Sequence, residues 1–123
     1  MSAHVVVLMT AGSTEEGHRI ARVLVDERLA ACVNVIPSVD SIYRWQGHVQ
    51  HDQEVLLMAK TSAAALEQLA KRVKQLHSYD TPEIIALPIV AGARDYLLWI
   101  DEETQALAAT STSRRIRVRT DTD

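Results

Sequence analysis

The sequence has few of the residues that build specialised scaffolds. Its 123 residues include no phenylalanine, one cysteine, three prolines and four glycines. The single cysteine, Cys32, excludes a disulfide within the chain, which suits a reducing compartment, and it excludes the paired-cysteine spacing of a zinc clamp. Without phenylalanine, the core has to be built from valine, leucine, isoleucine and alanine. The hydrophobic content of 47% is enough for one domain with one core.

Charge of one sign and long apolar runs are also scarce. The formal net charge is −3, so we expect no strong attraction to nucleic acid or to an acidic membrane surface. No apolar run approaches the length of a membrane span. The run from Val5 to Met9 is too short for the core of a signal peptide, and no Lys or Arg precedes it. These absences predict a cytoplasmic protein with neither nucleic acid nor a membrane as its partner.

The end of the sequence differs in composition from the rest. Residues 111–123 contain the run Arg-Arg-Ile-Arg-Val-Arg and no aromatic residue that could stack on bases. We therefore divide the chain into one folded domain, residues 1–110, and an Arg-rich tail, residues 111–123, which we expect to be disordered. The alternation of arginine with apolar residues has the period of a strand, so docking of the tail on a sheet edge stays open as an alternative.

The order of strand and helix patterns predicts the fold class. Strand patterns occupy five stretches: 5–10, 30–36, 39–46, 54–61 and 83–89. A first helix should begin at Ser13, which we expect to form a capping box with Glu16. A second should begin at the N-cap Ser62 and end before Pro82. A short last helix over 93–100 should face inward with Tyr96, Leu97 and Ile100.

These elements give the order β-α-β, a hairpin turning at Gly47, then β-α-β. The order is that of the α+β, ferredoxin-like fold, in which four antiparallel strands carry two helices on one face. The stretch 33–45 is longer than a typical strand of roughly five or six residues. Its outer part carries Ile42, Tyr43 and Trp45 and cannot all pair within a four-stranded sheet, so it invites pairing with another chain. We predict a homo-oligomer in which this segment crosses a subunit boundary.

Polar side chains gather where the second helix should meet the last strand. His77, Tyr79 and Glu83 fall within seven residues. An imidazole, a phenol and a carboxylate can serve acid–base chemistry or bind a cation. The simpler alternative, which spacing alone favours, is a polar helix cap and turn. No nucleophile elbow, phosphate loop or zinc-protease motif occurs in the sequence. We therefore expect that the protein is not an enzyme.

Cys32 and Lys60 are further candidates, each with a simpler alternative. A cysteine within a strand is usually a small buried hydrophobe, but in a symmetric oligomer several copies of Cys32 could converge on a soft metal. A lysine that ends an apolar strand usually reaches solvent along its stem. Facing a cleft, Lys60 would suit an anionic ligand.

Five runs of the sequence together carry a resemblance to a known family. They are LAACVNVIP at 29–37, SIYRW at 41–45, EVLLMAKT at 54–61, PEIIALPI at 82–89 and YLLWI at 96–100. In this order they resemble the CutA family of divalent-cation tolerance proteins, over roughly residues 4–103. The resemblance implies a ferredoxin-like subunit in a tight homotrimer, a role in the response to divalent metal ions, and binding of divalent metal ions, copper (Cu²⁺) in particular.

The resemblance also implies a polar cleft between subunits. The matching residues that we expect to bind metal are Cys32 and His77. Those that we expect to line the cleft are Trp45, Lys60, Tyr79 and Glu83. An alternative function is that of a PII-like signalling trimer, which would bind a small anionic ligand in the same cleft. An enzyme that uses His77, Glu83 and Cys32 ranks last.

The sequence departs from the resemblance at two positions. Where the family pattern is His-Pro-Tyr-Glu, this chain has His77-Ser78-Tyr79-Asp80. Ser78 leaves φ free where a proline would fix it. Asp80 keeps the charge of the glutamate but has a shorter reach. We expect these changes to alter the shape of the cleft.

Overall fold

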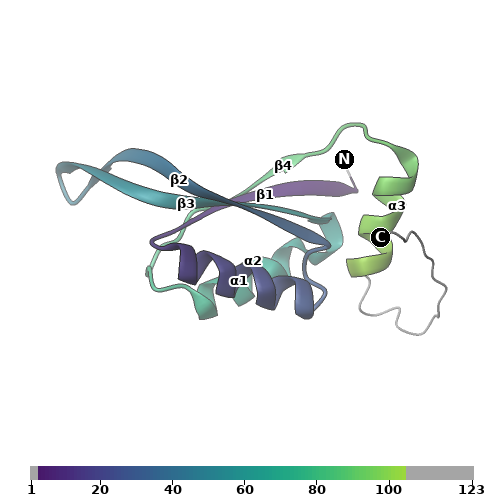
Figure 1. Ribbon diagram of the computed structural model, residues 1–123. Coiled ribbons are helices and arrows are strands. Elements are labelled where there is room, and N and C mark those ends of the chain that lie inside the picture. The colour runs from purple at the N-terminus through teal and green to yellow at the C-terminus, as the bar shows by residue number, and fades with distance from the viewer. Residues whose placement is uncertain (1–2, 105–123) are drawn as a thin grey trace.

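The strands and helices follow one another in the predicted order (Figure 1). A computed structural model describes residues 3–104. The elements are β1 (His4–Ala11), α1 (Thr14–Asp26), β2 (Cys32–Trp45), β3 (His48–Ser62), the single 3-10 turn η1 (Ala63–Ala65), α2 (Leu66–Leu76), β4 (Ile84–Pro88) and α3 (Arg94–Thr104). The sheet order is β2-β3-β1-β4, with every neighbouring pair antiparallel. This topology confirms the predicted ferredoxin-like fold.

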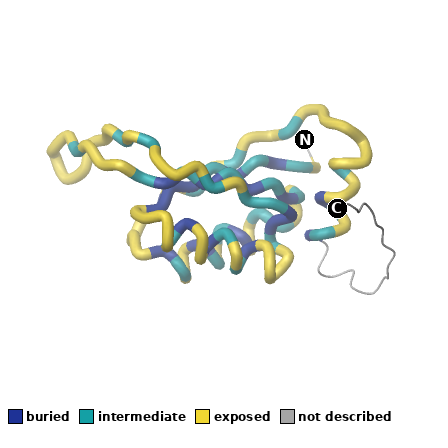
Figure 2. Tube along the Cα trace, in the orientation of Figure 1, coloured by how far each residue is buried: buried dark blue, intermediate teal, exposed yellow. Residues whose placement is uncertain are grey.

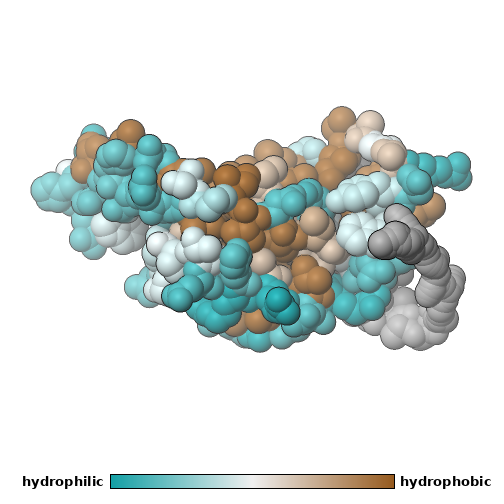
Figure 3. Space-filling model, viewed as in Figure 1, coloured by the Kyte–Doolittle hydropathy of each residue, from teal (hydrophilic) through white to brown (hydrophobic). Residues whose placement is uncertain are grey.

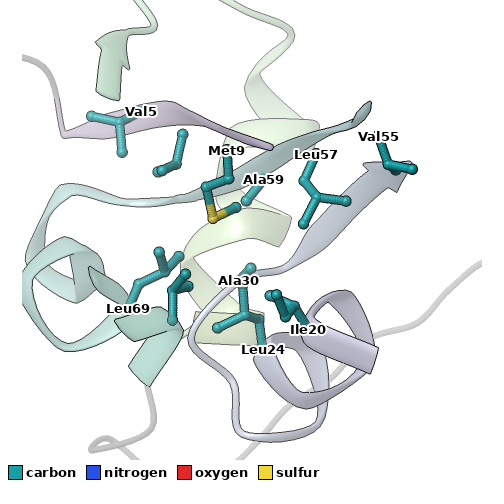
Figure 4. Packing of buried hydrophobic residues seen from close by; sticks show 11 residues of the cluster. Val5, Met9, Ile20, Leu24, Ala30, Val55, Leu57, Ala59 and Leu69 are labelled. Carbon is teal, nitrogen blue, oxygen red and sulfur yellow. The ribbon is translucent and has the colours of Figure 1, made fainter. Parts of the chain in front are cut away.

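The core lies between the sheet and the two helices α1 and α2, which cover one face of it (Figures 1 and 4). Alternate strand residues and one stripe of each helix point into this layer, as the periods of 2 and 3.6 require. The fully buried members are Val7, Met9, Ile20, Leu24, Leu57, Ala59, Leu69 and Val73. The core thus contains aliphatic residues and a methionine, as the lack of phenylalanine predicted.

The long hairpin between β2 and β3 extends well beyond the sheet. Of the 15 residues of β3, only Val55–Ser62 pair with β1. The first half of β3 therefore pairs with β2 alone. We call Val39–Trp45 and His48–Glu54 the hairpin arm; it projects to the left in Figure 1 and is largely exposed in Figure 2. The pairing becomes irregular between Ile36 and Val39, where Pro37 cannot donate to the ladder. The predicted unusual length of this segment is therefore confirmed. The prediction that its outer part cannot all pair within the sheet is wrong, because Val39–Trp45 pair with His48–Glu54 of the same chain.

The face of the sheet opposite α1 and α2 is covered at one end by α3. There His4 Nε2 lies 2.9 Å from Asp101 Oδ1, and the hydroxyls of Ser62 and Thr104 lie 3.2 Å apart. The remainder, which we call the open sheet face, is mostly apolar. Its apolar residues are Val6, Leu8, Ile36, Leu56, Met58, Ile85 and Leu87, and the same registers place the polar Thr10, Asn34 and Lys60 among them. In Figure 3, apolar side chains gather over the strands, whereas the helices below them carry mostly hydrophilic ones.

The start of α1 is capped differently from the prediction. Ser13 Oγ accepts a hydrogen bond from the Glu16 N–H at 3.1 Å, so the N-cap is confirmed. The Glu16 carboxylate, however, accepts from the backbone N–H and the hydroxyl of Ser78, at 2.8 and 3.1 Å. The reciprocal half of the predicted capping box is wrong, because the loop after α2 offers this carboxylate two donors.

Two predicted details at the other helices are also wrong. Ser62 makes no side-chain cap bond, since η1 separates it from the first turn of α2. α3 extends to Thr104, whose hydroxyl donates to the Ile100 carbonyl at 2.8 Å. Ile100 is fully buried, as predicted, whereas Tyr96 is 43% exposed. None of the helices described in residues 3–104 is long and apolar enough to cross a membrane. Residues 105–110 of the predicted domain and the whole predicted tail, 111–123, lie outside the described residues.

Candidate functional site

His77 ends α2 and is buried beside the end of β1. Its side chain is 1% exposed. Nε2 lies 2.7 Å from the Thr10 carbonyl oxygen, which can only accept a hydrogen bond, so Nε2 carries the proton. Nδ1 accepts a hydrogen bond from the Tyr79 N–H at 3.0 Å. In the neutral ring both nitrogens are therefore occupied by partners within the subunit.

Glu16 connects α1 to the loop that carries these residues. Its carboxylate holds Ser78 by two hydrogen bonds and lies 3.6 Å from His77 Nδ1. Burial acts to raise the pKa of Glu16, but the hydrogen bonds from Ser78, together with smaller contributions from His77 and the Gly12 backbone, give a lowered pKa overall. We call this arrangement the Glu16–Ser78 clamp. It fixes the first residues after α2 against the start of α1.

Tyr79 connects the same loop to the base of the hairpin arm. Its hydroxyl donates to Glu54 Oε2 at 2.7 Å, and its ring centroid lies 4.6 Å from that of His77. Burial, and next the hydrogen bond to Glu54, raise the pKa of the Tyr79 phenol strongly. The Tyr79 hydroxyl also lies close to the backbone of Gly12. A side chain at position 12 would be crowded, because its Cβ would lie 3.2 Å from the Tyr79 hydroxyl oxygen. Tyr79 is thus a protonated donor held from two sides.

A cavity of about 690 Å³ lies between the hairpin arm and the segment 79–83; we call it the arm cavity. It is lined by Thr10, Asp40, Ser41, Ile42, Tyr43, Trp45, Glu54, Tyr79, Asp80, Thr81 and Glu83. Three of the four predicted cleft residues, Trp45, Tyr79 and Glu83, are therefore brought together in one subunit. The lining found in the described part of the chain has four carboxylates and three aromatic rings, and no Lys, Arg or His.

Lys60, the fourth predicted cleft residue, lies away from this cavity. It pairs with Cys32 across β2 and β3, and with Val6 on its other side. Its ammonium group donates a hydrogen bond to Asn34 Oδ1 on the neighbouring strand. No lining residue of the arm cavity, as the structure describes it, therefore supplies a positive charge.

The two predicted metal ligands lie toward opposite ends of the sheet. Cys32 is a free, half-buried cysteine at the register of Val6, whereas His77 contacts Thr10. Four residues of extended strand separate Val6 from Thr10, which corresponds to roughly 13 Å. Within residues 3–104, no three His, Cys, Asp or Glu side chains are grouped as metal ligands. One subunit alone does not bring Cys32 and His77 together.

Cys32 has a phenol as its neighbour. Burial, followed by the proximity of Cys32, raises the pKa of the Tyr96 phenol of α3. Cys32 thus lies where α3 meets the sheet, at the border of the open sheet face.

Several charged or aromatic residues of the site were not predicted as site residues: Glu16, and in the cavity lining Asp40, Tyr43, Glu54 and Asp80. The hairpin register would have found Glu54, because counting outward from the turn at Gln46-Gly47 brings Glu54 opposite Val39. Glu16 gave no such signal, since its partner Ser78 is 62 residues away. Local spacing assigned it to a cap.

Residues 5–103 of the chain match the family described as CutA1 divalent ion tolerance protein. The chain belongs to this family. It is 57% identical over 99 residues to the divalent-cation tolerance protein CutA of Thermus thermophilus, covering 80% of this chain and 96% of that protein. It is 46% identical over 101 residues to the chloroplastic protein CutA of Arabidopsis thaliana, where the match covers 82% of this chain and 56% of the plant protein.

Solved structures of CutA proteins have the same fold. The Thermus thermophilus structure superposes with a TM-score of 0.81 at 55% identity, covering 82% of this chain and 98% of that one. CutA1 of Oryza sativa has a TM-score of 0.81 at 45% identity, covering 84% and 94%. The resemblance noted in the sequence is therefore confirmed at the level of family and fold.

Proposed function

We propose that this CutA protein protects against divalent metal ions by binding them as a homotrimer, with Cu²⁺ as the preferred ion. The match of residues 5–103 to the divalent ion tolerance family is the observation that carries this proposal. Membership in the family supports the general role in cation tolerance. The copper preference, the trimer and the ligands are proposals argued from the subunit.

The open sheet face supports assembly with further copies of the chain. Ile85 and Leu87 on this face are 52% and 50% exposed, although both lie within a strand of the central sheet. The hairpin arm adds Ile42 and Val49, which are 70% and 64% exposed. Apolar side chains in such numbers are typical of a surface that is covered in the assembled protein. A trimer would cover the open sheet face.

Cys32 is the better placed of the two proposed metal ligands. It lies next to the open sheet face, where the same residue of further copies could complete a site that one subunit lacks. A thiolate is a soft ligand and suits copper. His77 would first have to give up its hydrogen bond with Tyr79 or with Thr10. The geometry therefore favours a site built on Cys32 between subunits.

Metal titration of three proteins tests this proposal. Cu²⁺, and Zn²⁺ as a metal that cannot oxidise the thiol, would be titrated calorimetrically into the wild type, Cys32→Ser and His77→Gln. Light scattering would give the mass of each. We expect the wild type and His77→Gln to bind with the same stoichiometry per trimer, and Cys32→Ser to lose the tight phase for both ions. Equal binding by Cys32→Ser would remove this residue from the site, and a monomeric wild type would refute the trimer.

The alternative of a PII-like trimer that binds a small anionic ligand gains no support from the arm cavity. Four carboxylates in the lining would repel an anion. A thermal-shift screen with anionic metabolites distinguishes the two functions, because a ligand of the native state raises the melting temperature. We further propose that the protein is not an enzyme, since its sequence carries no nucleophile elbow, phosphate loop or zinc-protease motif. We also propose that it acts in the cytoplasm.

A further inference from the structure

The arm cavity has a composition that the binding of metal does not explain. Its four carboxylates, Asp40, Glu54, Asp80 and Glu83, come from the arm on one side and from the loop after α2 on the other. The described residues contain no grouping of three such side chains around one point. A bare divalent ion needs several oxygen ligands at bonding distance. The cavity is also far larger than one ion, at about 690 Å³, a volume within the range of small-molecule sites.

Aromatic rings are the second component of the lining. Tyr43, Trp45 and Tyr79 are 40%, 51% and 38% exposed, so their rings present surface to whatever fills the space. Two of them are fixed by carboxylates, since Tyr79 donates to Glu54 and Tyr43 donates to Asp52. A ring that is held in place loses little freedom when a ligand packs on it.

We propose that the arm cavity binds a small organic ammonium ion, held by the faces of these rings and by the surrounding carboxylates. Aromatic faces attract a cation, most strongly one whose charge is spread over alkyl groups and is weakly hydrated. The carboxylates attract the same ligand at longer range. An anion meets only negative charge in this lining, and a neutral molecule gains no Coulombic attraction from the carboxylates.

The position of Trp45 makes this site depend on the arm. Trp45 is the last residue of β2 and pairs with His48 beside the turn at Gly47, whereas Tyr79 and Glu83 belong to the body of the subunit. A ligand in the cavity therefore contacts both the arm and the body. Its binding should hold the arm in one orientation.

Tetramethylammonium is a suitable probe, and tert-butanol is a neutral molecule of similar size and shape. Both would be titrated into the assembled wild-type protein and followed by the NMR signals of the two tryptophan indole N–H groups. We expect a saturable shift of the Trp45 signal with tetramethylammonium and none with tert-butanol. Trp99, which lies in α3 outside the lining, should not shift with either probe.

Two variants locate the binding. Trp45→Leu should weaken tetramethylammonium binding by roughly tenfold, and the matched control Trp99→Leu should leave it unchanged. Glu83→Gln should weaken binding and make it less sensitive to salt, because a screened charge has been removed. Both variants would be read by calorimetry, since Trp45→Leu has lost its reporter.

Two results would overturn the proposal. One is a Trp45 signal that does not respond to tetramethylammonium. The other is binding of tert-butanol as tightly as tetramethylammonium, which would mean that the charge of the ligand is irrelevant. Neither result bears on the metal titration, because Cys32 lies outside the lining of the arm cavity.

Discussion

Replacing Ser78 with proline tests the contribution of the Glu16–Ser78 clamp. Proline is also the residue that the family pattern has at this position. The substitution removes both donors of the clamp, because proline has neither the N–H nor the hydroxyl that now reach Glu16. The preceding backbone tolerates it, since His77 has φ −80° and ψ 144°, which lie in the region that a following proline requires.

The expected change in the free energy of unfolding is the difference of two effects. Hydrogen bonds to a charged group contribute about 1.5–3 kcal/mol when buried, and we take about 1 kcal/mol for each of these because Ser78 is exposed. Proline also restricts the unfolded chain, which raises the free energy of unfolding by about 0.4–1 kcal/mol. Ser78→Pro should therefore lose about 1–1.5 kcal/mol. Ser78→Ala keeps the N–H and removes only the hydrogen bond of the hydroxyl, so it should lose about 1 kcal/mol.

Urea unfolding at a fixed subunit concentration measures these changes, because the stability of an oligomer depends on concentration. The pKa of Glu16 is lowered in the folded state, so its contribution is complete above the ordinary value of 4.5 and is lost as the pH falls through the lower folded value. The loss caused by Ser78→Pro should be full at pH 7 and shrink in acid. In the Glu16→Gln background it should be smaller at pH 7. A Ser78→Pro protein as stable as the wild type at pH 7 would refute the clamp.

Three further predictions address the site and the fold. Tyr79→Phe removes the hydrogen bond to Glu54 and should lower the free energy of unfolding in urea by about 0.5–1.5 kcal/mol. In an ultraviolet titration with alkali, the same substitution should remove the phenol that ionises last. An unchanged titration would contradict the raised pKa of Tyr79. Leu24→Ala creates a cavity in the core and should cost about 2–5 kcal/mol, whereas the neighbouring Val25, 42% exposed, should tolerate alanine within about 0.5 kcal/mol. Gly47→Ala should cost about 1 kcal/mol by thermal unfolding, because φ is +82° there; a neutral result would mean that the turn rearranges.

Features of the fold that depend on local spacing were predictable from the sequence. Leu69 and Val73 are four residues apart in α2, the spacing of one helix face, and both are fully buried. The predicted turn at Gly47 is confirmed, since glycine readily adopts the positive φ found there. The excess length of the arm followed from the long extended pattern of residues 33–45.

The contacts of the site were predictable only in part, because they join distant segments. The cluster of His77 and Tyr79 was visible as neighbours in sequence, but the partners that occupy both nitrogens of His77 include Thr10, which is 67 residues away. The separation of Cys32 from His77 depends on the register of β1 with β3, which composition and periodicity do not specify. The same register keeps Lys60 out of the arm cavity.

The central position of β1 determines when the sheet can be completed during synthesis. β1 is the first strand to be made, yet its two partners follow much later, since Val5 pairs with Thr61 of β3 and with Pro88 of β4. The hairpin of β2 and β3 is local and forms rapidly, on the order of microseconds. Until residues 84–88 leave the ribosome, β1 has one edge without a partner while the apolar side chains of the arm are already present. A nascent chain that stalls before β4 is therefore the form of this protein most prone to aggregate.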